Sequence, residues 1–272
     1  MNRFTSADLD KARNGHIGPL LRNWRAVRSI SQLALALEAG VSTRHLSYVE
    51  TGRAQPSREM VLRLADALQV PLRERNSLLL AAGYAPFYSE TPLNTPEMAE
   101  AQRALEFILA QQEPYPAIVV DRRFDILMLN SATERFLALF PECKPPGAPN
   151  ALRLIFHPEG LRPFIDDWEQ VAGRLIQRVH REVAANPSDL PTRLLLDELL
   201  SYPGVPRGWQ LAELDVSPGP LLSIGYRRTD YTLRFFSMIT TFGTPQDLTL
   251  QGLRVESFFP ADDTTRQKLA PS

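Results

Sequence analysis

The sequence predicts two domains, a small all-α domain followed by a larger α+β domain with an antiparallel sheet. Its 272 residues exceed the usual length of one domain. Apolar residues recur at three- and four-residue steps in the first part, whereas β-rich segments separated by turns follow Trp209. Residues 1–84 hold 12 Lys and Arg against 7 Asp and Glu, a net charge of +5, and residues 85–272 hold 18 against 24, a net of −6. The basic, helical part therefore favours contact with a polyanion, and the acidic part argues against it.

The segment 31–57 has the spacing of a helix-turn-helix. Ser31 and Ser42 stand where two short helices can begin, because a serine hydroxyl caps the free N–H groups of a first helical turn. Gly40 lies between them, where glycine turns the chain left-handed at little cost. A longer amphipathic helix over 13–28 precedes the motif. This arrangement holds one helix rigidly, so that its side chains can enter the major groove of DNA.

Apolar spacing predicts the inward faces of these helices. In the second helix we expect Leu33, Ala34 and Leu37 to face inward, and in the third helix Leu46 and Val49. Two further apolar-periodic helices follow, which makes five helices in the first domain.

Many residues of this region together resemble the XRE (Cro/C1-type) family of bacterial helix-turn-helix repressors. They are Gln32, Ala34, Gly40, Val41, Ser42, Leu46, Glu50, Gly52, Pro56 and Ser57. The resemblance covers about residues 14–84 and is specific, because many spacings agree at once. It implies a five-helix, lambda-repressor-like DNA-binding domain. It also implies that Glu50 is structural, because the matching acid of the family pairs with an arginine of the first helix, here Arg25.

The third helix is the predicted recognition helix, so its N-terminal residues should meet base edges. Arg44 is the candidate for direct readout, because its planar guanidinium can pair with O6 and N7 of guanine, a contact worth roughly 1–3 kcal/mol of discrimination. Gln32 matches the family position that approaches a phosphate. The full set of candidate DNA-binding residues is Gln32, Thr43, Arg44, His45, Ser47, Arg53 and Gln55. For Arg44 and His45 the alternative is an exposed side chain that contacts no base.

Composition also predicts the domain bounds. The proline-rich segment 85–99 has little periodicity and is interpreted as a linker between a domain over 1–84 and a domain over 100–272. In the second domain a β-hairpin is expected over 117–129, and Asn130 precedes an amphipathic helix. Further helices are expected over 150–156, 158–179 and 188–200, and further strands over 211–216, 221–226, 231–242 and 253–259. Strands at both ends with helices between them suit one antiparallel sheet covered by helices.

This second domain resembles the MmyB-like ligand-binding domain found behind such helix-turn-helix modules, on the order of strand, strand, Asn130 and helix. The resemblance implies a PAS-like fold and a sensor of apolar small molecules. Such a domain holds its ligand where the helices meet the sheet. The candidate ligand-binding residues are aromatic side chains that can line a pocket, and polar ones that can hold a head group: Phe136, Phe156, Phe164, Trp168 and Phe236, with Asn130, Arg153 and His157. For each aromatic residue the alternative is ordinary core packing.

The sequence argues against catalysis and against a bound metal or cofactor. The carboxylate pairs Asp166–Asp167 and Asp197–Glu198 are adjacent, and neighbours on a helix point about 100° apart, so neither pair converges on one substrate. The sequence has no glycine-rich phosphate loop and no GxSxG motif, and no histidine has metal-ligand spacing to Cys143 or to a second histidine. A single cysteine and the lack of a long apolar run predict a cytoplasmic protein without a membrane span.

Two functions remain open. The leading one is a sequence-specific transcriptional regulator, a repressor, which binds a double-stranded DNA operator as a homodimer and whose C-terminal domain senses a small, largely apolar, fatty-acid-like molecule. The alternative keeps the DNA-binding role but gives the C-terminal domain only dimerisation or a protein partner. An isolated C-terminal fragment that dimerises and binds no small molecule would favour the alternative.

Overall fold

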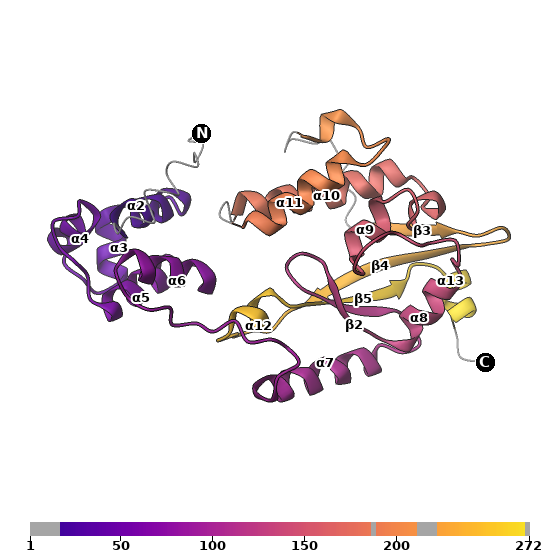
Figure 1. Cartoon of the computed structure of the whole chain (residues 1–272), viewed down its shortest axis with the longest axis horizontal. Helices are drawn as coiled ribbons and strands as arrows, with labels where there is room; N and C mark the ends of the chain where they lie inside the picture. The colour runs from indigo at the N-terminus through magenta and orange to yellow at the C-terminus, as the bar shows by residue number, and fades with distance from the viewer. Residues whose placement is uncertain (1–16, 186–188, 211–221, 270–272) are drawn as a thin grey trace. The chain divides into compact units, whose positions relative to one another are not determined.

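The computed structural model describes residues 17–185, 189–210 and 222–269 (Figure 1). The start of the predicted first helix, before Ile17, lies outside the described residues. So does the strand predicted over 211–216.

The chain forms two compact units. Unit 1 comprises the residues up to Thr91 and, from much further along the chain, Thr244–Gln251. Unit 2 comprises Pro92–Gly243 and the residues from Gly252 onward. The chain therefore passes between the two units three times, once after Thr91 and once at each end of the second segment of unit 1.

Unit 1 is helical, as predicted. Its helices are α2 (Ile17–Val27), α3 (Gln32–Glu38), α4 (Thr43–Glu50), α5 (Arg58–Ala67) and α6 (Leu72–Ala81), and α12 (Leu248–Gly252) begins in its second segment. Ser31, Ser42 and Ser57 cap α3, α4 and α5, each accepting a hydrogen bond of 3.1–3.2 Å from the backbone N–H three residues on. Gly40 has a φ of 63° between α3 and α4. The predicted helix-turn-helix is confirmed.

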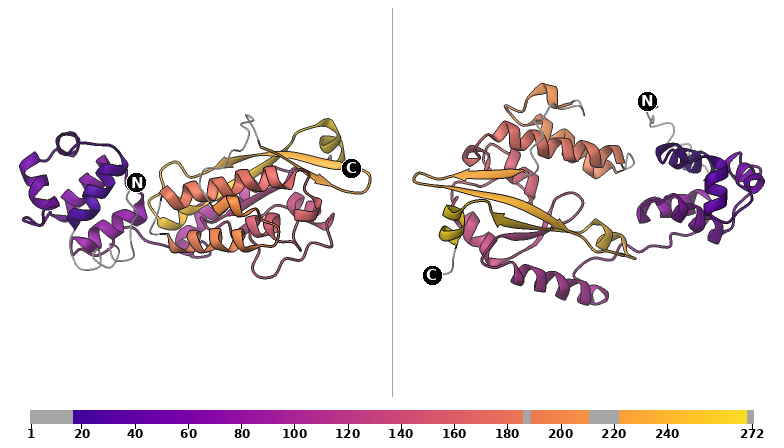
Figure 2. Two further views of the ribbon diagram at one scale, coloured as in Figure 1. Left: turned by 90° about the horizontal axis from the view of Figure 1, so that it is seen from above. Right: turned by 180° about the vertical axis from the view of Figure 1, so that it is seen from behind.

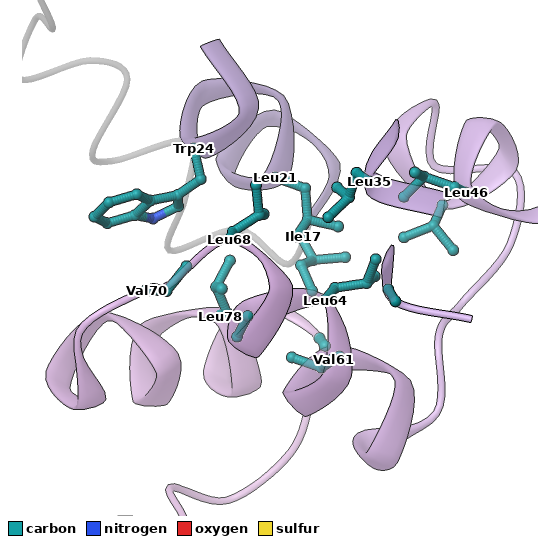
Figure 3. Packing of buried hydrophobic residues seen from close by; sticks show 14 of the residues in the cluster. Ile17, Leu21, Trp24, Leu35, Leu46, Val61, Leu64, Leu68, Val70 and Leu78 are labelled. Atoms are coloured by element: carbon teal, nitrogen blue, oxygen red, sulfur yellow. The ribbon is translucent and has the colours of Figure 1, made fainter. Parts of the chain in front are cut away.

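Figure 3 shows how these helices meet around one apolar core. Leu21 of α2, Leu35 of α3, Leu46 of α4 and Leu64 of α5 are completely buried. Burial of each such side chain stabilises the fold by about 1.5–3 kcal/mol. The core fixes α4 against α2 and α3, so the outer face of α4 is presented by a rigid scaffold.

The inward face predicted for α3 is wrong. Leu33 and Leu37 are 68% and 83% exposed, whereas Leu35, Ala36 and Ala39 are buried. The helix carries two apolar pairs at i and i+4 spacing, one at 33 and 37 and one at 35 and 39. Periodicity alone cannot choose between two such pairs. Tertiary packing makes the choice, because Leu35, Ala36 and Ala39 belong to the core that α3 shares with the other helices.

Unit 2 is built on an antiparallel sheet, which in the described residues has five strands in the order β2-β1-β5-β4-β3. The strands are β1 (Ala117–Val120), β2 (Ile126–Leu129), β3 (Ser223–Arg227), β4 (Thr232–Thr240) and β5 (Arg254–Pro260). The last strand lies in the centre, where Val255 stands opposite Val119 of β1 and Thr240 of β4. The predicted α+β domain with an antiparallel sheet is confirmed, and the central place of the last strand is that of a PAS-like sheet.

The helices of unit 2 are α7 (Ala99–Gln111), α8 (Ser131–Ala138), α9 (Ala151–Phe156), α10 (Trp168–Ala185), α11 (Leu190–Ser201) and α13 (Asp263–Leu269), with single 3-10 turns over 96–98, 162–164 and 207–210. The helix predicted from Pro158 onward begins at Trp168 instead. Asp167 has a φ of 48°, and a left-handed residue cannot continue a right-handed helix. The prediction of that helix start was therefore wrong.

Two helix layers cover the sheet of unit 2. Figures 1 and 2 show α10 and α11 side by side, and α7 on the other side of the sheet. Because side chains alternate along a strand, Ser237 of β4 and Glu256 of β5 face the space under α10, whereas Val255 faces Leu105 of α7. The face under α10 holds the cavity described below.

Candidate DNA-reading face and ligand cavity

The outer face of α4 carries a pre-positioned arginine. Arg44 is exposed, and its Nε donates a hydrogen bond of 3.1 Å to the hydroxyl of Tyr48, one turn further along. The guanidinium carbon lies 5.4 Å from the centre of the Tyr48 ring, within the range of a cation–π contact. The terminal Nη1 and Nη2 of Arg44 make no hydrogen bond to any described residue. The donors of these two nitrogens are therefore available to a ligand.

Behind that face lies a buried ion pair. The Glu50 side chain is 2% exposed, and its two carboxylate oxygens accept bonds of 2.7 Å and 3.0 Å from Nε and Nη2 of Arg25. Gln32 donates a third bond of 3.0 Å to the same carboxylate. The hydrogen bond with Glu50 raises the pKa of Arg25 further above its ordinary value, although partial burial opposes it. The predicted pairing of Glu50 with Arg25 is confirmed, and it ties α2 and α3 to α4.

The loop after α4 is held at both ends. The backbone N–H of Arg53 donates to the carbonyl of Tyr48 at 2.7 Å, while its side chain is exposed. The Gln55 side chain donates to the carbonyl of Ala82 at 3.0 Å, at the end of α6. The candidate DNA-binding residues thus lie at the start of α3, along α4 and in this loop: Gln32, Thr43, Arg44, His45, Ser47, Arg53 and Gln55.

Unit 2 contains a cavity of about 680 Å³ between the sheet and α8, α9 and α10. Sites for small molecules have volumes of about 300–1,000 Å³ and mostly apolar walls with a few placed polar groups. The apolar wall residues here include Ile118, Phe124, Ile126, Phe136, Leu137, Leu152, Leu154, Ile155, Leu161, Leu175, Leu222, Ile224, Phe235 and Phe258. The charged and amide wall residues are Arg174, Gln177, Arg178, Arg181 and Glu256. The cavity therefore suits an amphiphile.

One end of the cavity is charged. The ring of the buried Phe124 lies 5.1 Å from the guanidinium of Arg178 and 5.4 Å from that of Arg254. Both arginines also donate to one oxygen of Glu182, at 3.3 Å and 2.9 Å. The aromatic ring and the carboxylate together hold Arg178 of α10 close to β5. Glu256 lies two residues further along β5, at this same end.

The other end of the cavity is aromatic. Tyr226 of β3 lies with its ring centre 5.0 Å from that of Phe136 and 6.2 Å from those of Phe140 and Phe235. Its side chain lines the cavity and the residue is 5% exposed. Burial, and to a smaller extent the negative charge of Glu256, raise the pKa of Tyr226 well above its ordinary value.

Of the candidate ligand-binding residues, Phe136 lines the cavity. The others lie outside its lining: Asn130, Arg153, Phe156, His157, Phe164, Trp168 and Phe236.

The polar candidates have structural partners. Asn130 caps α8, and its Oδ1 also accepts from the N–H of Ala117 in β1 at 3.0 Å. Arg153 donates two bonds, of 2.7 Å and 2.8 Å, to Glu198 of α11. His157 accepts a bond of 3.1 Å from the N–H of Glu159 through Nδ1. None of these three groups points a free donor into the cavity.

Four aromatic candidates pack elsewhere. Phe156 is completely buried among α9, α10 and α11 and meets Trp168 edge to face at 5.9 Å. Phe164 lies against Phe140 at 5.1 Å. Phe236 stacks on a phenylalanine of β5 at 5.5 Å, on the opposite face of the sheet from Phe235. Sequence reasoning found the aromatic supply but not which face each ring occupies.

The sequence analysis missed the polar wall of α10. Arg174, Gln177, Arg178 and Arg181 recur at steps of three and four and therefore share one helix face. A basic row beside the apolar stripe of the same helix was the signal that could have found them. Tyr226 gave no such signal, because an alternating strand with one tyrosine is ordinary.

A basic helix-turn-helix unit joined to a separate α+β unit with an amphiphile-sized cavity defines a DNA-binding transcription regulator with a ligand-binding domain. Comparison with known families agrees. The MmyB-like transcription regulator ligand binding domain matches residues 101–271, and a helix-turn-helix domain matches residues 16–78. The chain therefore belongs to the MmyB-like transcription regulators, as the sequence resemblance predicted.

No curated protein matches this sequence. Among solved structures, an RNA-binding light-oxygen-voltage receptor aligns with 99% of this chain and 68% of its own, at 13% identity and a TM-score of 0.26. At that TM-score the alignment supports no shared fold. No described helix is long and apolar enough to cross a membrane.

Proposed function

We propose that the protein is a cytoplasmic repressor that binds its operator as a homodimer. Its affinity for DNA changes when a fatty-acid-like amphiphile occupies unit 2. The observation that carries the sensing role is the cavity of about 680 Å³, with an apolar interior and arginines on one wall. A cavity of this kind is not needed if unit 2 serves only for dimerisation, because association requires an apolar outer face rather than a hollow interior.

The geometry of α4 supports the DNA-binding role. Arg44 would read guanine through the Nη groups that Tyr48 leaves available, since Tyr48 engages only Nε. Arg53, exposed in the next loop, would contact a phosphate. Residues 1–84 carry a net charge of only +5, so a single copy offers few phosphate contacts. Two copies on a two-fold symmetric operator would double them.

The charged end of the cavity supports an anionic head group. Arg178 and Arg181 lie on the same wall, and guanidinium groups bind carboxylates through charge-assisted hydrogen bonds. Glu256 lies at the same end and disfavours a ligand with several negative charges. A single-headed, single-chain amphiphile fits both observations.

Regulation requires that the ligand bind two arrangements of the protein unequally. A difference of about 1–3 kcal/mol between them would alter operator affinity by roughly 5–150-fold.

Native mass spectrometry of the freshly purified full chain, followed by denaturation, tests the ligand. We expect a discrete small mass, or uptake of added dodecanoate, in the wild type. Leu175→Trp should abolish uptake, because Leu175 lines the cavity and the larger ring would fill it. Ala184→Trp is the matched control, since Ala184 is exposed on the same helix and outside the lining.

The same protein, with and without dodecanoate, is then titrated against a DNA duplex selected from random sequence. A changed affinity in the wild type and in Ala184→Trp, but not in Leu175→Trp, is the expected result. A dimeric chain that binds DNA tightly and takes up no amphiphile would overturn the sensing role and favour dimerisation alone.

A further inference from the structure

Tyr226 is a buried polar side chain whose hydroxyl makes no hydrogen bond to any described residue. Three aromatic rings surround it, and the space that it lines is the cavity. The hydroxyl is not among the buried atoms that lack a hydrogen bond, so it is reached from the open space of the cavity. A bound ligand can therefore supply the hydrogen-bond partner of the Tyr226 hydroxyl.

Strand register separates Tyr226 from the charged end. Tyr226 stands opposite Leu233 on β4, and Glu256 stands opposite Ile239 on the same strand. Six residues along a strand span roughly 20 Å between Cα positions. The Cα positions of Tyr226 and Glu256 are therefore well separated, although the charge of Glu256 still reaches the Tyr226 phenol, and both side chains line one continuous cavity.

We propose that Tyr226 donates a hydrogen bond to a hydroxyl or carbonyl group on the ligand's chain, separate from the anionic head held by the arginines of α10. The cavity would then select an oxygenated amphiphile, such as a hydroxy fatty acid, rather than a plain alkyl chain. This inference rests on the proposed sensing function. It adds a second polar group to the ligand and names the residue that recognises it.

A pair of probes tests the inference. Dodecanoate and 12-hydroxydodecanoate have the same chain length and differ by one terminal hydroxyl. Binding of each to the full chain is measured by calorimetry for the wild type, Tyr226→Phe and Tyr231→Phe. Tyr231 is the matched control, because it lies outside the cavity lining at the turn between β3 and β4.

Tyr226→Phe should weaken the binding of 12-hydroxydodecanoate by about tenfold, which corresponds to ~1.4 kcal/mol. The affinity for dodecanoate should stay unchanged or rise slightly. Tyr231→Phe should affect neither probe. Equal effects of Tyr226→Phe on the two probes would overturn the role of Tyr226 while leaving the sensing function intact. Failure of both probes to bind the wild type would instead remove the sensing function and this inference with it.

A second, independent observation concerns the segment between β4 and β5, which belongs to unit 1. The Asp247 carboxylate accepts bonds of 3.2 Å and 2.8 Å from the backbone N–H and the hydroxyl of Thr91. The N–H of Leu248 donates to the carbonyl of Ser89 at 2.8 Å. We call these contacts the Asp247 clasp. The predicted linker is therefore gripped by a segment more than 150 residues away in sequence.

The helical part of unit 1 holds the same linker. The Asn76 side chain of α6 accepts from the N–H groups of Phe87 and Tyr88, at 2.9 Å and 3.0 Å, and donates to the carbonyl of Tyr88 at 2.8 Å. Arg75 donates to the Tyr88 hydroxyl at 3.3 Å. Residues 87–91 are thus bonded both to the helix-turn-helix unit and to the β4–β5 segment.

The strands on either side of the clasp carry cavity residues, Ser237 on β4 and Glu256 on β5, which hydrogen-bond to each other at 2.7 Å. We infer that the Asp247 clasp transmits ligand occupancy to the linker of the helix-turn-helix unit. A ligand that shifts β4 and β5 would strengthen or break the hydrogen bonds of the Asp247 clasp, because the segment that carries Asp247 directly connects these two strands. The inference rests on the proposed sensing function and assigns its route.

Hydrogen exchange of the full chain tests the route without any knowledge of the operator. With saturating dodecanoate we expect slower exchange in β3–β5 and at least about a twofold change in the exchange rate of residues 87–91. Asp247→Ala should retain the first effect and lose the second. Gln246→Ala, an exposed neighbour, is the control and should retain both.

If dodecanoate slows exchange in the strands of the wild type but leaves the exchange of residues 87–91 unchanged, the clasp is not the route of transmission, and the sensing function still stands. Absence of protection in the strands would remove the sensing function itself. If Asp247→Ala retained the linker effect, the transmission would run through another part of the chain and the inference would fall.

Discussion

The two units place their polar side chains in opposite ways. In unit 1 both carboxylate oxygens of the buried Glu50 accept hydrogen bonds from Arg25 and Gln32, whereas Arg44 and Arg53, which are proposed to meet DNA, are exposed. In unit 2 the buried Tyr226 has no partner among the described residues, and the groups proposed to meet a ligand line the inside. A buried group whose hydrogen bonds are satisfied is part of the scaffold, whereas a hydroxyl that faces a cavity and has no protein partner is available to a ligand.

The difference follows from the partners. A DNA duplex cannot enter a protein, so a DNA reader must hold its readout residues outward on a rigid support. A small amphiphile can be enclosed, and enclosure removes its chain from water. Substitutions at matched positions of the two units can break or sharpen this comparison.

Removal of Arg25 should have the largest effect. Arg25→Ala leaves the Glu50 carboxylate buried without its main partner, so we expect about 2–4 kcal/mol of destabilisation, confined to unit 1. Urea titration with hydrogen exchange of peptides from α2 and α4 measures it, with α10 peptides as an internal reference. Arg22→Ala, exposed on the same helix, should change stability by less than about 0.5 kcal/mol. If the two variants unfold alike, the ion pair is not part of the scaffold.

Removal of Arg44 should leave stability unchanged and cost DNA recognition. We expect Arg44→Ala to lose roughly 1–3 kcal/mol of preference at one base position, because its fork would no longer read guanine. Arg53→Ala is the contrasting variant. It should weaken all sequences alike and reduce the salt dependence by about one unit. Competition binding with selected and scrambled duplexes separates the two effects. An unchanged base preference in Arg44→Ala would show that the reading face lies elsewhere.

Lowering the pH tests how much the Arg153–Glu198 ion pair contributes to the stability of unit 2. Hydrogen bonds from Arg153 lower the pKa of Glu198, although partial burial opposes them. Its contribution to stability is therefore complete above the ordinary glutamate value of about 4.3 and is lost as the pH falls through the lower value in the folded protein. The Glu198 side chain is 35% exposed, so solvent screening keeps the effect below about 1 kcal/mol.

Unfolding of the wild type and of Glu198→Gln between pH 6 and pH 3 measures that contribution. The wild type should lose more stability over this range than the variant, because only the wild type must protonate the paired carboxylate. Parallel losses in the two proteins would mean that the Arg153–Glu198 pair does not couple α9 to α11.

A small effect on stability is also expected at Tyr226. Tyr226→Phe removes a hydroxyl that bonds to nothing described, so the ligand-free protein should change by less than about 1 kcal/mol, in either direction. Thermal unfolding after delipidation measures it. A loss as large as that of Arg25→Ala would show that the phenol has a structural partner, and the contrast between the two units would fail.

The sequence by itself determined the local features. Serine caps, the glycine turn and apolar periodicity act over a few residues, so the helices of the DNA-binding unit and the opening hairpin could be predicted. The pairing of Glu50 with Arg25 was predicted only because the sequence resembles a known family. Only the tertiary structure decided which apolar pair of α3 is buried, Leu35 with Ala39 rather than Leu33 with Leu37, since both pairs have the same spacing. It also decided the cavity, whose walls join α8, α10 and strand residues as distant in sequence as Ile118 and Phe258, and the contact of Asp247 with Thr91. Such sites depend on which faces of distant helices and strands come into contact. These contacts form only when long loops of the chain close, and local sequence patterns do not predict them.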